Sequence, residues 1–172
     1  MTKYFLLFIG SLLLMSVQSK KVKQSPDQLN IQAIRQIEIE QYDSAIVLFN
    51  ELLKIDPTYP DAYYNRGGCK QFVGNHSGAI FDFDHAIKLN PKDEDCYYSR
   101  GLSKFEIKAF RGALQDFNKV IDLKPHYIEA FYDRAFCYKA LDMNDHACAD
   151  FHMAYDRGLK EAKKQFKEVC KK

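Results

Sequence analysis

A six-residue pattern returns twice along this chain at one constant interval. The segment YYNRGG at Tyr63–Gly68 recurs as YYSRGL at Tyr97–Leu102 and as FYDRAF at Phe131–Phe136. A unit of this length cannot bury its own apolar face, so such units become stable only by stacking on their neighbours. Aligned on this interval, the chain divides into four blocks, which are residues 26–59, 60–93, 94–127 and 128–161. The sequence therefore predicts a stacked array of four repeats.

Four positions of the block carry the same type of side chain in every copy. Position 4 is large and apolar, position 8 is small, position 20 is alanine and position 24 is phenylalanine. In that order, the columns are Leu29, Tyr63, Tyr97 and Phe131; Ala33, Gly67, Gly101 and Ala135; Ala45, Ala79, Ala113 and Ala147; and Phe49, Phe83, Phe117 and Phe151. Within a block the apolar positions are spaced by three and four residues, as on one face of a helix.

Proline marks the end of the block. Pro57, Pro91 and Pro125 stand at position 32 of the first three blocks, where proline ends a helix because it cannot donate a hydrogen bond in a helix interior. Each block is therefore predicted to be two antiparallel helices. The small residues at positions 8 and 20 let these helices approach closely.

This pattern resembles the tetratricopeptide repeat (TPR) family, and the chain is similar to short exported bacterial members of it. The resemblance covers residues 26–161 and implies an all-α solenoid of four helix-turn-helix repeats. After Gly158 the segment LKEAKKQFKEVCKK places its apolar residues on one helical face and its lysines elsewhere. We expect a helix that caps the last repeat, with residues 162–172 as its remainder. A basic patch for an acidic partner is the alternative interpretation.

Residues 1–19 have the features of a secretory signal peptide. Lys3 precedes the apolar run YFLLFIGSLLLM, and polar residues follow it. The run is about 12 residues long, whereas a membrane-spanning helix needs roughly 20. We expect cleavage after Ser19, a linker over residues 20–25, and a periplasmic or secreted mature chain without a membrane span. An uncleaved anchor is the alternative.

Five cysteines in an exported chain suggest disulfide bonds. Cys148 lies early in the second helix of the last repeat, and Cys170 lies late in the expected capping helix. The turn at Arg157–Gly158 makes these helices antiparallel, so the two thiols are level and we predict a Cys148–Cys170 disulfide. Cys69 and Cys96, on first helices of neighbouring repeats, are a second possible pair. Cys137 would remain a buried free thiol.

Arginine at position 7 and aspartate at position 23 are present together in three blocks and absent together from the first. Because these positions are level in an antiparallel pair, we predict salt bridges within the repeats, namely Arg66–Asp82, Arg100–Asp116 and Arg134–Asp150. As exposed pairs each would contribute well under ~1 kcal/mol. The alternative is a row of arginines that binds a phosphate or carboxylate ligand.

Catalysis is not expected from these residues. The five histidines occupy no common column, and the motifs of zinc proteases, thiol oxidoreductases, serine hydrolases and phosphate-binding loops are missing from the sequence. His146, Cys148 and His152 are a weak candidate for a metal site. A net charge of +2 gives no reason to expect nucleic acid as a partner. We expect no cofactor.

The family resemblance implies a peptide-binding groove formed by positions 2, 5, 9, 12 and 13 of the first helices. Tyrosine and phenylalanine suit peptide binding because they offer broad contact area. The candidate residues are Tyr64, Tyr98, Tyr132, Phe72, Leu102, Phe105, Phe136, Gln71 and Lys139, with Glu106 as a polar neighbour and Asn30 in the tyrosine column. Alternatively, the tyrosines pack across neighbouring first helices.

Position 2 is acidic in every block, as Asp27, Asp61, Asp95 and Glu129. Family members that clamp the terminal carboxylate of a chaperone use basic side chains there, so we do not expect that clamp. The predicted function is a non-catalytic adaptor or scaffold that binds a protein or peptide outside the cytoplasm. A self-assembling structural module is the alternative, and an enzyme or metal-binding protein is the third interpretation.

Overall fold

The computed structural model describes residues 23–59 and 61–170, and the predicted signal peptide lies outside this part of the chain. The described residues are all-α. In chain order the helices are α1 (Pro26–Glu38), α2 (Tyr42–Ile55), α3 (Ala62–Phe72), α4 (His76–Leu89), α5 (Glu94–Glu106), α6 (Phe110–Leu123), α7 (Ile128–Ala140), α8 (Asn144–Asp156) and α9 (Ala162–Val169). They form four sequential pairs followed by a C-terminal helix, which confirms the predicted fold class.

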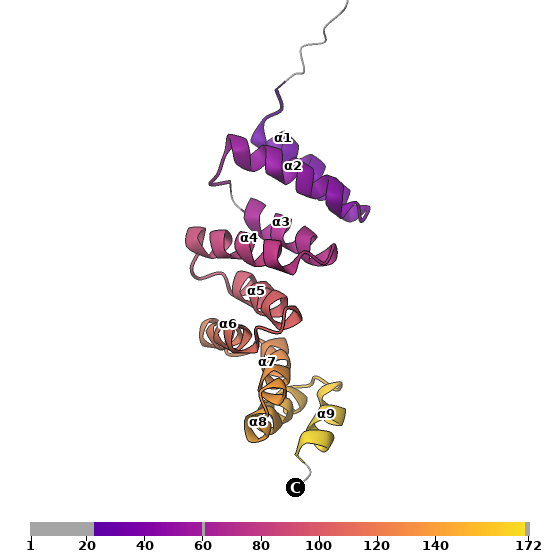
Figure 1. Cartoon of the computed structure of the whole chain (residues 1–172), viewed down its shortest axis with the longest axis vertical. Coiled ribbons are helices and arrows are strands. Elements are labelled where there is room, and N and C mark those ends of the chain that lie inside the picture. The colour runs from indigo at the N-terminus through magenta and orange to yellow at the C-terminus, as the bar shows by residue number, and fades with distance from the viewer. Residues whose placement is uncertain (1–22, 60, 171–172) are drawn as a thin grey trace, which may run out of the picture.

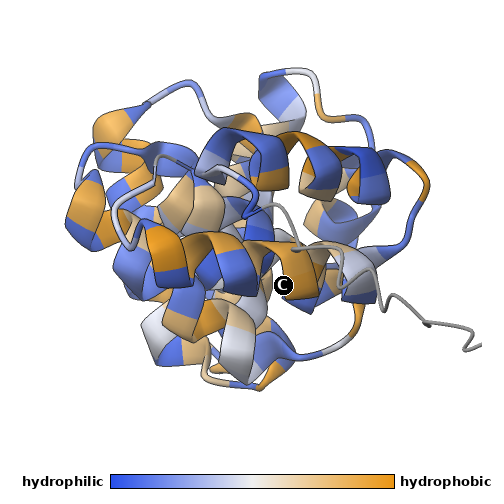
Figure 2. Cartoon of the chain, turned by 90° about the horizontal axis from the view of Figure 1, so that it is seen from above, coloured by the Kyte–Doolittle hydropathy of each residue, from blue (hydrophilic) through white to orange (hydrophobic). Residues whose placement is uncertain are grey.

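The pairs are stacked along the long axis of an elongated molecule, with α1 and α9 at opposite ends (Figure 1). Each second helix packs on the first helix of the next repeat, and the first helices α3, α5 and α7 also contact one another in sequence. Hydrophobic and hydrophilic residues alternate around the helices (Figure 2). The first helices thus share one side of the stack. No helix in the described part of the chain is both long and apolar enough to cross a membrane.

The position-24 phenylalanines form the centre of each repeat. All four side chains, Phe49, Phe83, Phe117 and Phe151, are completely buried. Each lies against the small residue at position 8 of its partner helix: a Cβ atom added at Gly67 would stand 2.8 Å from Cε1 of Phe83, and one at Gly101 would stand 2.8 Å from Cε1 of Phe117. Glycine therefore permits the closest approach of the two helices in repeats two and three.

The turn within each repeat has a left-handed residue at position 15. Glu40, Gly74, Lys108 and Asp142 have φ angles of 59°, 77°, 61° and 58°. The second helices α2, α4 and α6 each end two residues before proline. In the fourth repeat Gly158, with a φ of 106°, ends the pair instead. Backbone geometry thus repeats even where the residue type does not.

Helix α9 covers the open side of the fourth repeat. Phe166 and Val169 pack against a buried cluster that contains Ala147 and Phe151. Cys148 of α8 and Cys170 form a disulfide, with Cα atoms 5.3 Å apart, as the sequence predicted. The lysines of α9 are exposed. This arrangement is that of a capping helix.

The predicted Cys69–Cys96 pair is absent, because both cysteines are buried free thiols in the described chain, as is Cys137. Positions 10 and 3 of the repeat are seven residues apart, which is two helical turns, so both thiols face the preceding repeat. Cys69 belongs to the core cluster of repeat one, together with Ala33, whereas Cys96 lies beside Ala86 of repeat two. Burial raises the pKa of the Cys69 thiol to about 11, so this thiol stays protonated at neutral pH.

Two glycine substitutions on α3 test the close contact at position 8. In Gly67→Ala the new methyl group meets the buried ring of Phe83, and we expect the free energy of unfolding to fall by about 1–3 kcal/mol from overpacking. In Gly68→Ala the new methyl group meets nothing within 4 Å beyond the adjacent residues and the backbone of α3 itself, and alanine should raise stability by about 0.5–1 kcal/mol through helix propensity. Urea unfolding monitored by circular dichroism measures both; equal effects would contradict the packing.

Candidate functional site: the groove between α5 and α7

In each of the three position-7 arginines, all three guanidinium nitrogens donate a hydrogen bond to another side chain. Each guanidinium donates two hydrogen bonds to the position-23 aspartate of its own repeat, as between Arg66 and Asp82, where Nη2 lies 2.6 Å from Oδ1. The equivalent pairs are Arg100–Asp116 and Arg134–Asp150. These pairs are the ones that the sequence predicted. They occupy all three arginines, which therefore do not form a free row for an anionic ligand.

The prediction that these pairs are exposed is wrong. Asp82, Asp116 and Asp150 are 0%, 2% and 6% exposed. The aspartate at position 23 directly precedes the central phenylalanine in sequence. The arginine side chain lies over this aspartate. Lys70 and Lys104 add a second cation to Asp82 and Asp116, each at 2.8 Å.

Sequence reasoning missed that each arginine also reaches the preceding repeat. The remaining nitrogen Nη1 donates to position 25 of that repeat: Arg66 to Asn50 at 2.7 Å, Arg100 to Asp84 at 2.6 Å and Arg134 to Asn118 at 2.7 Å. Asn50, Asp84 and Asn118 themselves recur at the interval of the repeat, and this recurrence was a signal that could have been found. The arginine therefore joins neighbouring repeats as well as the two helices of one repeat.

The two partners of Arg100 should differ widely in their effect on stability. Removing the buried carboxylate in Asp116→Ala leaves Lys104 without its counter-charge and Arg100 with the exposed Asp84 alone, and we expect a loss of about 3–5 kcal/mol. Asp84 is 44% exposed, so Asp84→Ala should cost at most about 1 kcal/mol. Denaturant unfolding of the two variants compares them; a similar loss in both would contradict the burial difference.

The tyrosine column at position 5 packs largely within the stack. Tyr64, Tyr98 and Tyr132 are half-buried, and each ring lies 5.7–5.9 Å from the central phenylalanine of its own repeat. Tyr98 also reaches across to the next repeat, where its hydroxyl donates to Oδ2 of Asp133 at 2.6 Å. The alternative interpretation, packing across neighbouring first helices, thus describes Tyr98. Asn30 of the same column has a buried Oδ1 without a hydrogen-bond partner among the described residues.

The side chains of three other predicted groove residues are directed to different parts of the stack. Phe72 is 72% exposed at the end of α3 and stacks on Tyr42 of repeat one, with ring centroids 4.5 Å apart. Gln71 is half-buried and donates from Nε2 to Oγ of Ser103 at 2.8 Å. Lys139 is exposed at the end of α7. The predicted set is therefore not one continuous surface.

A cavity of about 370 Å³ lies between α5 and α7, and we call it the α5–α7 groove. It is lined by Leu102, Phe105, Glu106, Asp133 and Phe136. Leu102, Phe105 and Phe136 are predicted groove residues, and Glu106 was expected as their polar neighbour. Helical spacing brings them together, because positions 9 and 12 or 13 lie one turn apart on the same face of a first helix. Asp133 was not predicted as a site residue.

Asp133 gives the α5–α7 groove its charge. Desolvation by burial raises the pKa of this carboxyl group to about 6, while the hydrogen bond from Tyr98 lowers it and the nearby charge of Glu129 raises it further. At neutral pH the carboxyl group is ionised, and burial makes its charged form less stable than it would be in water. The groove therefore combines apolar walls with one destabilised negative charge.

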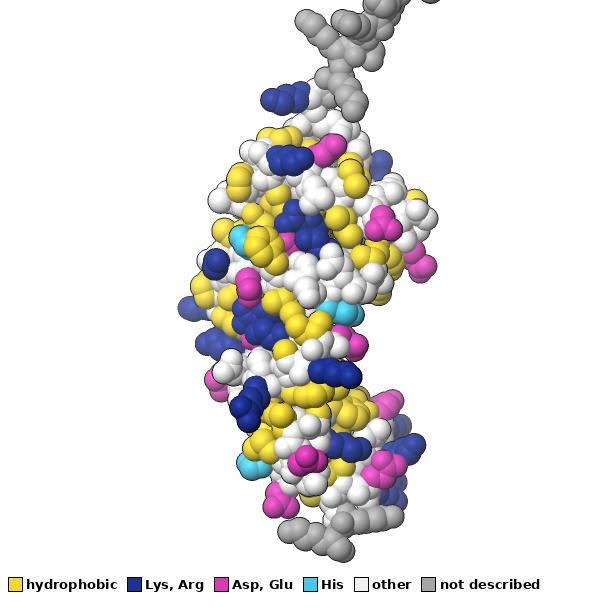
Figure 3. Space-filling view, viewed as in Figure 1, with side chains coloured by type: hydrophobic (Ala, Val, Ile, Leu, Met, Phe, Trp, Pro, Cys, Tyr) yellow, Lys and Arg dark blue, Asp and Glu magenta, His cyan; other side chains and the backbone are white. Residues whose placement is uncertain are grey.

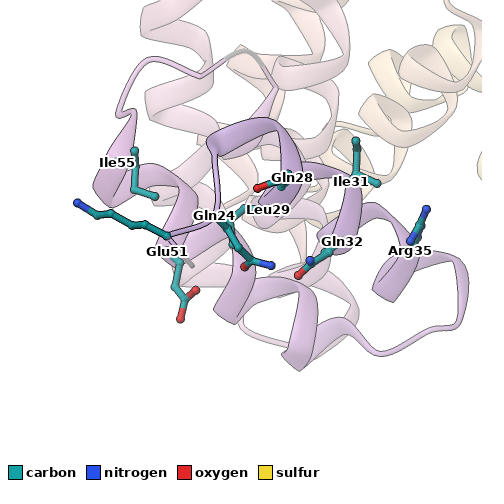
Figure 4. Close-up of a pocket in the computed structure, with 9 residues that line it drawn as sticks. Gln24, Gln28, Leu29, Ile31, Gln32, Arg35, Glu51 and Ile55 are labelled. Atoms are coloured by element: carbon teal, nitrogen blue, oxygen red, sulfur yellow. The ribbon is translucent and has the colours of Figure 1, made fainter. Parts of the chain in front are cut away.

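A second, larger cavity of about 770 Å³ lies at the N-terminal end of the stack, beside α1 and α2. Its lining includes Gln28, Gln32, Arg35, Glu51 and Ile55, whose side chains are spread along α1 and α2 rather than aimed at one point (Figure 4). On the first helices α3 and α5, the side on which the cysteines lie is covered by the preceding repeat. No described repeat precedes α1, so the equivalent side of α1 has no such cover among the described residues. This cavity therefore lies at the end of the described stack, and its described lining does not converge on a ligand.

The described residues give little indication of any other functional site. They hold no group of three or more His, Cys, Asp or Glu side chains that could bind a metal ion. Charges of both signs are interspersed with hydrophobic side chains over the face seen in Figure 3. The α5–α7 groove is thus the candidate functional site.

Two family models match the chain, a TPR repeat over residues 37–68 and a tetratricopeptide repeat over residues 60–93. Residues 37–93 therefore match TPR repeats, and the four stacked helix pairs of the described chain have the arrangement of such repeats. Proteins built on this fold typically bind peptides or proteins and are usually non-catalytic. No curated protein matches the chain by sequence.

Solved structures of TPR proteins are similar to this chain. The crystal structure of MamA is 26% identical, with a TM-score of 0.75 over 80% of this chain and 81% of that chain. The first TPR of Spaghetti (RPAP3), bound to an HSP90 peptide SRMEEVD, is 24% identical, with a TM-score of 0.66 over 70% and 95%. YrrB, described as a TPR protein with an unusual peptide-binding site, is 18% identical, with a TM-score of 0.69 over 76% and 68%.

Proposed function

We propose that this protein is a non-catalytic adaptor that binds a segment of another protein in the α5–α7 groove. The observation that carries the proposal is the groove itself, where apolar side chains of two repeats face one cavity beside a carboxylate. Such a mixture is typical of sites that hold a ligand by apolar contact and orient it by a few polar groups. The peptide bound by the RPAP3 domain and the peptide-binding site of YrrB support a similar role on this fold.

We further propose that the adaptor acts outside the cytoplasm, in the periplasm or as a secreted protein. The sequence of residues 1–19 supports export, as does the disulfide between Cys148 and Cys170, because disulfides persist in oxidising compartments. The bond closes a loop of 22 residues and fixes the capping helix on the last repeat.

Self-association is the second candidate function. It is favoured by the N-terminal end of the stack, which no described repeat covers and where a second copy could supply a neighbour for α1. In that case the mass in solution would rise with concentration, and the groove would not be needed for assembly.

Affinity capture tests the groove directly. The full chain with a C-terminal tag is used as bait in native cell-envelope extract, beside Phe136→Ala, which opens the wall of the groove. Phe81→Ala is the matched control, because Phe81 is 57% exposed on α4, away from the groove. We expect a partner that the wild type and the control retain and Phe136→Ala loses. Retention by all three baits would contradict the proposal, as would a concentration-dependent mass without any partner.

Export has a separate test. The tagged chain is expressed in its own cells, which are then fractionated, and the N-terminus of the purified protein is sequenced. We expect the protein outside the cytoplasm and a mature chain that begins at Lys20. An intact Met1 and a cytoplasmic location together would contradict export.

A further inference from the structure

We propose that the α5–α7 groove selects a peptide segment in which a lysine or arginine stands beside large apolar side chains, and that Asp133 receives the cation. This inference rests on the proposed function and specifies the chemistry of the ligand.

The first argument is that Asp133 is not paired with a cation among the described residues. Each of the buried aspartates at position 23 is bound by an arginine, and Asp82 and Asp116 by a lysine as well. In the described part of the chain, the hydrogen bond that Asp133 receives comes from the neutral hydroxyl of Tyr98, and no ion pair includes it. Carboxylates withdrawn from water are normally paired with a cation, because an isolated charge is costly there. A ligand can supply this cation.

The second argument is that the basic side chain next to Asp133 and those of the facing helix α5 are already engaged. Arg134, which follows Asp133, donates to Asp150 and Asn118. On α5, Arg100 and Lys104 are bound to Asp116. These cations are directed to the second helices and leave the charge of Asp133 facing the groove. Glu106 lines the same cavity and is exposed, so the rim adds a second negative charge.

The third argument is the rigidity of the apolar wall. Phe136 is held edge-on by two other rings, with centroids 4.9 Å from Tyr132 and 5.0 Å from Phe151. Phe105 is similarly in contact with Phe110 at 5.3 Å. A preformed aromatic wall binds an apolar side chain with little loss of its own conformational entropy. Aromatic rings also attract a cation placed over their faces, which favours lysine and arginine further.

The fourth argument is that the negative charge of the groove repels negatively charged ligands. A carboxylate ligand would meet Asp133 and Glu106 without a basic side chain in the described groove lining to offset them. Like charges brought together at an interface repel and suppress wrong partners. A cavity of about 370 Å³ is also suited to a few side chains of an extended segment, not to a folded surface.

The test uses three synthetic peptides with blocked ends and a fluorescent label. All have the sequence Gly-Leu-Phe-X-Phe-Leu-Gly, where X is lysine, norleucine, which has the same four-carbon chain without the ammonium group, or glutamate. Binding to the full chain is measured by fluorescence anisotropy. We expect the lysine peptide to bind about tenfold more tightly than the norleucine peptide, the size of one hydrogen bond to a charged group. The glutamate peptide should bind most weakly.

Two variants locate the preference. Asp133→Asn keeps an acceptor for the Tyr98 hydroxyl and removes the charge, so the lysine and norleucine peptides should bind this variant equally. Glu106→Gln, at the exposed rim, should reduce the preference about twofold because exposed charges interact weakly. Asp43→Asn removes an exposed acid of repeat one and is the matched control, with the full preference retained. Circular dichroism shows that each variant is folded.

The outcomes separate the two proposals. Equal binding of the lysine and norleucine peptides to the wild type would overturn the inference but leave peptide binding in the groove intact. Absence of binding by the lysine peptide would also overturn it, and the capture experiment with Phe136→Ala would then decide the proposed function by itself. A preference for lysine that persists in Asp133→Asn would place the cation elsewhere and overturn the assignment to Asp133.

Discussion

The structure depends on one contact that is made four times, between the phenylalanine at position 24 and the small residue at position 8. This contact sets the distance between the two helices of a repeat, and the buried ring leaves no room for a larger side chain opposite Phe83 or Phe117. Helices that lie this close present the rest of their surfaces at fixed angles to the neighbouring repeats. The groove between α5 and α7 exists because the repeats on either side are built to the same spacing.

A polar network fixes the register of the stack beside this apolar contact. Each of the three arginines ties its own repeat to the one before it, through one carboxylate and one further acceptor. A buried network of this kind is costly if any member is missing, so it favours a single arrangement of the repeats. The first repeat has neither residue of the pair, and it lies at the end of the stack, where its Arg35 faces a cavity.

Much of the fold could be predicted because the same residue types recur at one interval. The four helix pairs and the Arg–Asp pairs follow from that recurrence, and the capping helix follows from the apolar face of the segment after Gly158. The depth of the ion pairs could not be predicted, because burial depends on how the arginine lies across the next helix. Asp133 was missed as a site residue for a similar reason: its column reads Asn65, Ser99 and Asp133 and has no pattern. The structure is needed to show that this charge lines a cavity between α5 and α7. The possible Cys69–Cys96 pair does not form because each thiol is buried against the repeat that precedes its own.

The central claim is that the first helices of repeats three and four form the binding surface. Amide hydrogen exchange, measured by mass spectrometry with and without the lysine-centred peptide, tests this most directly because it reports on every helix at once. The account predicts slower exchange in α5 and α7 and unchanged exchange in α1 and α9. Protection confined to α9, or to α1 and α2 at the other end, would contradict it.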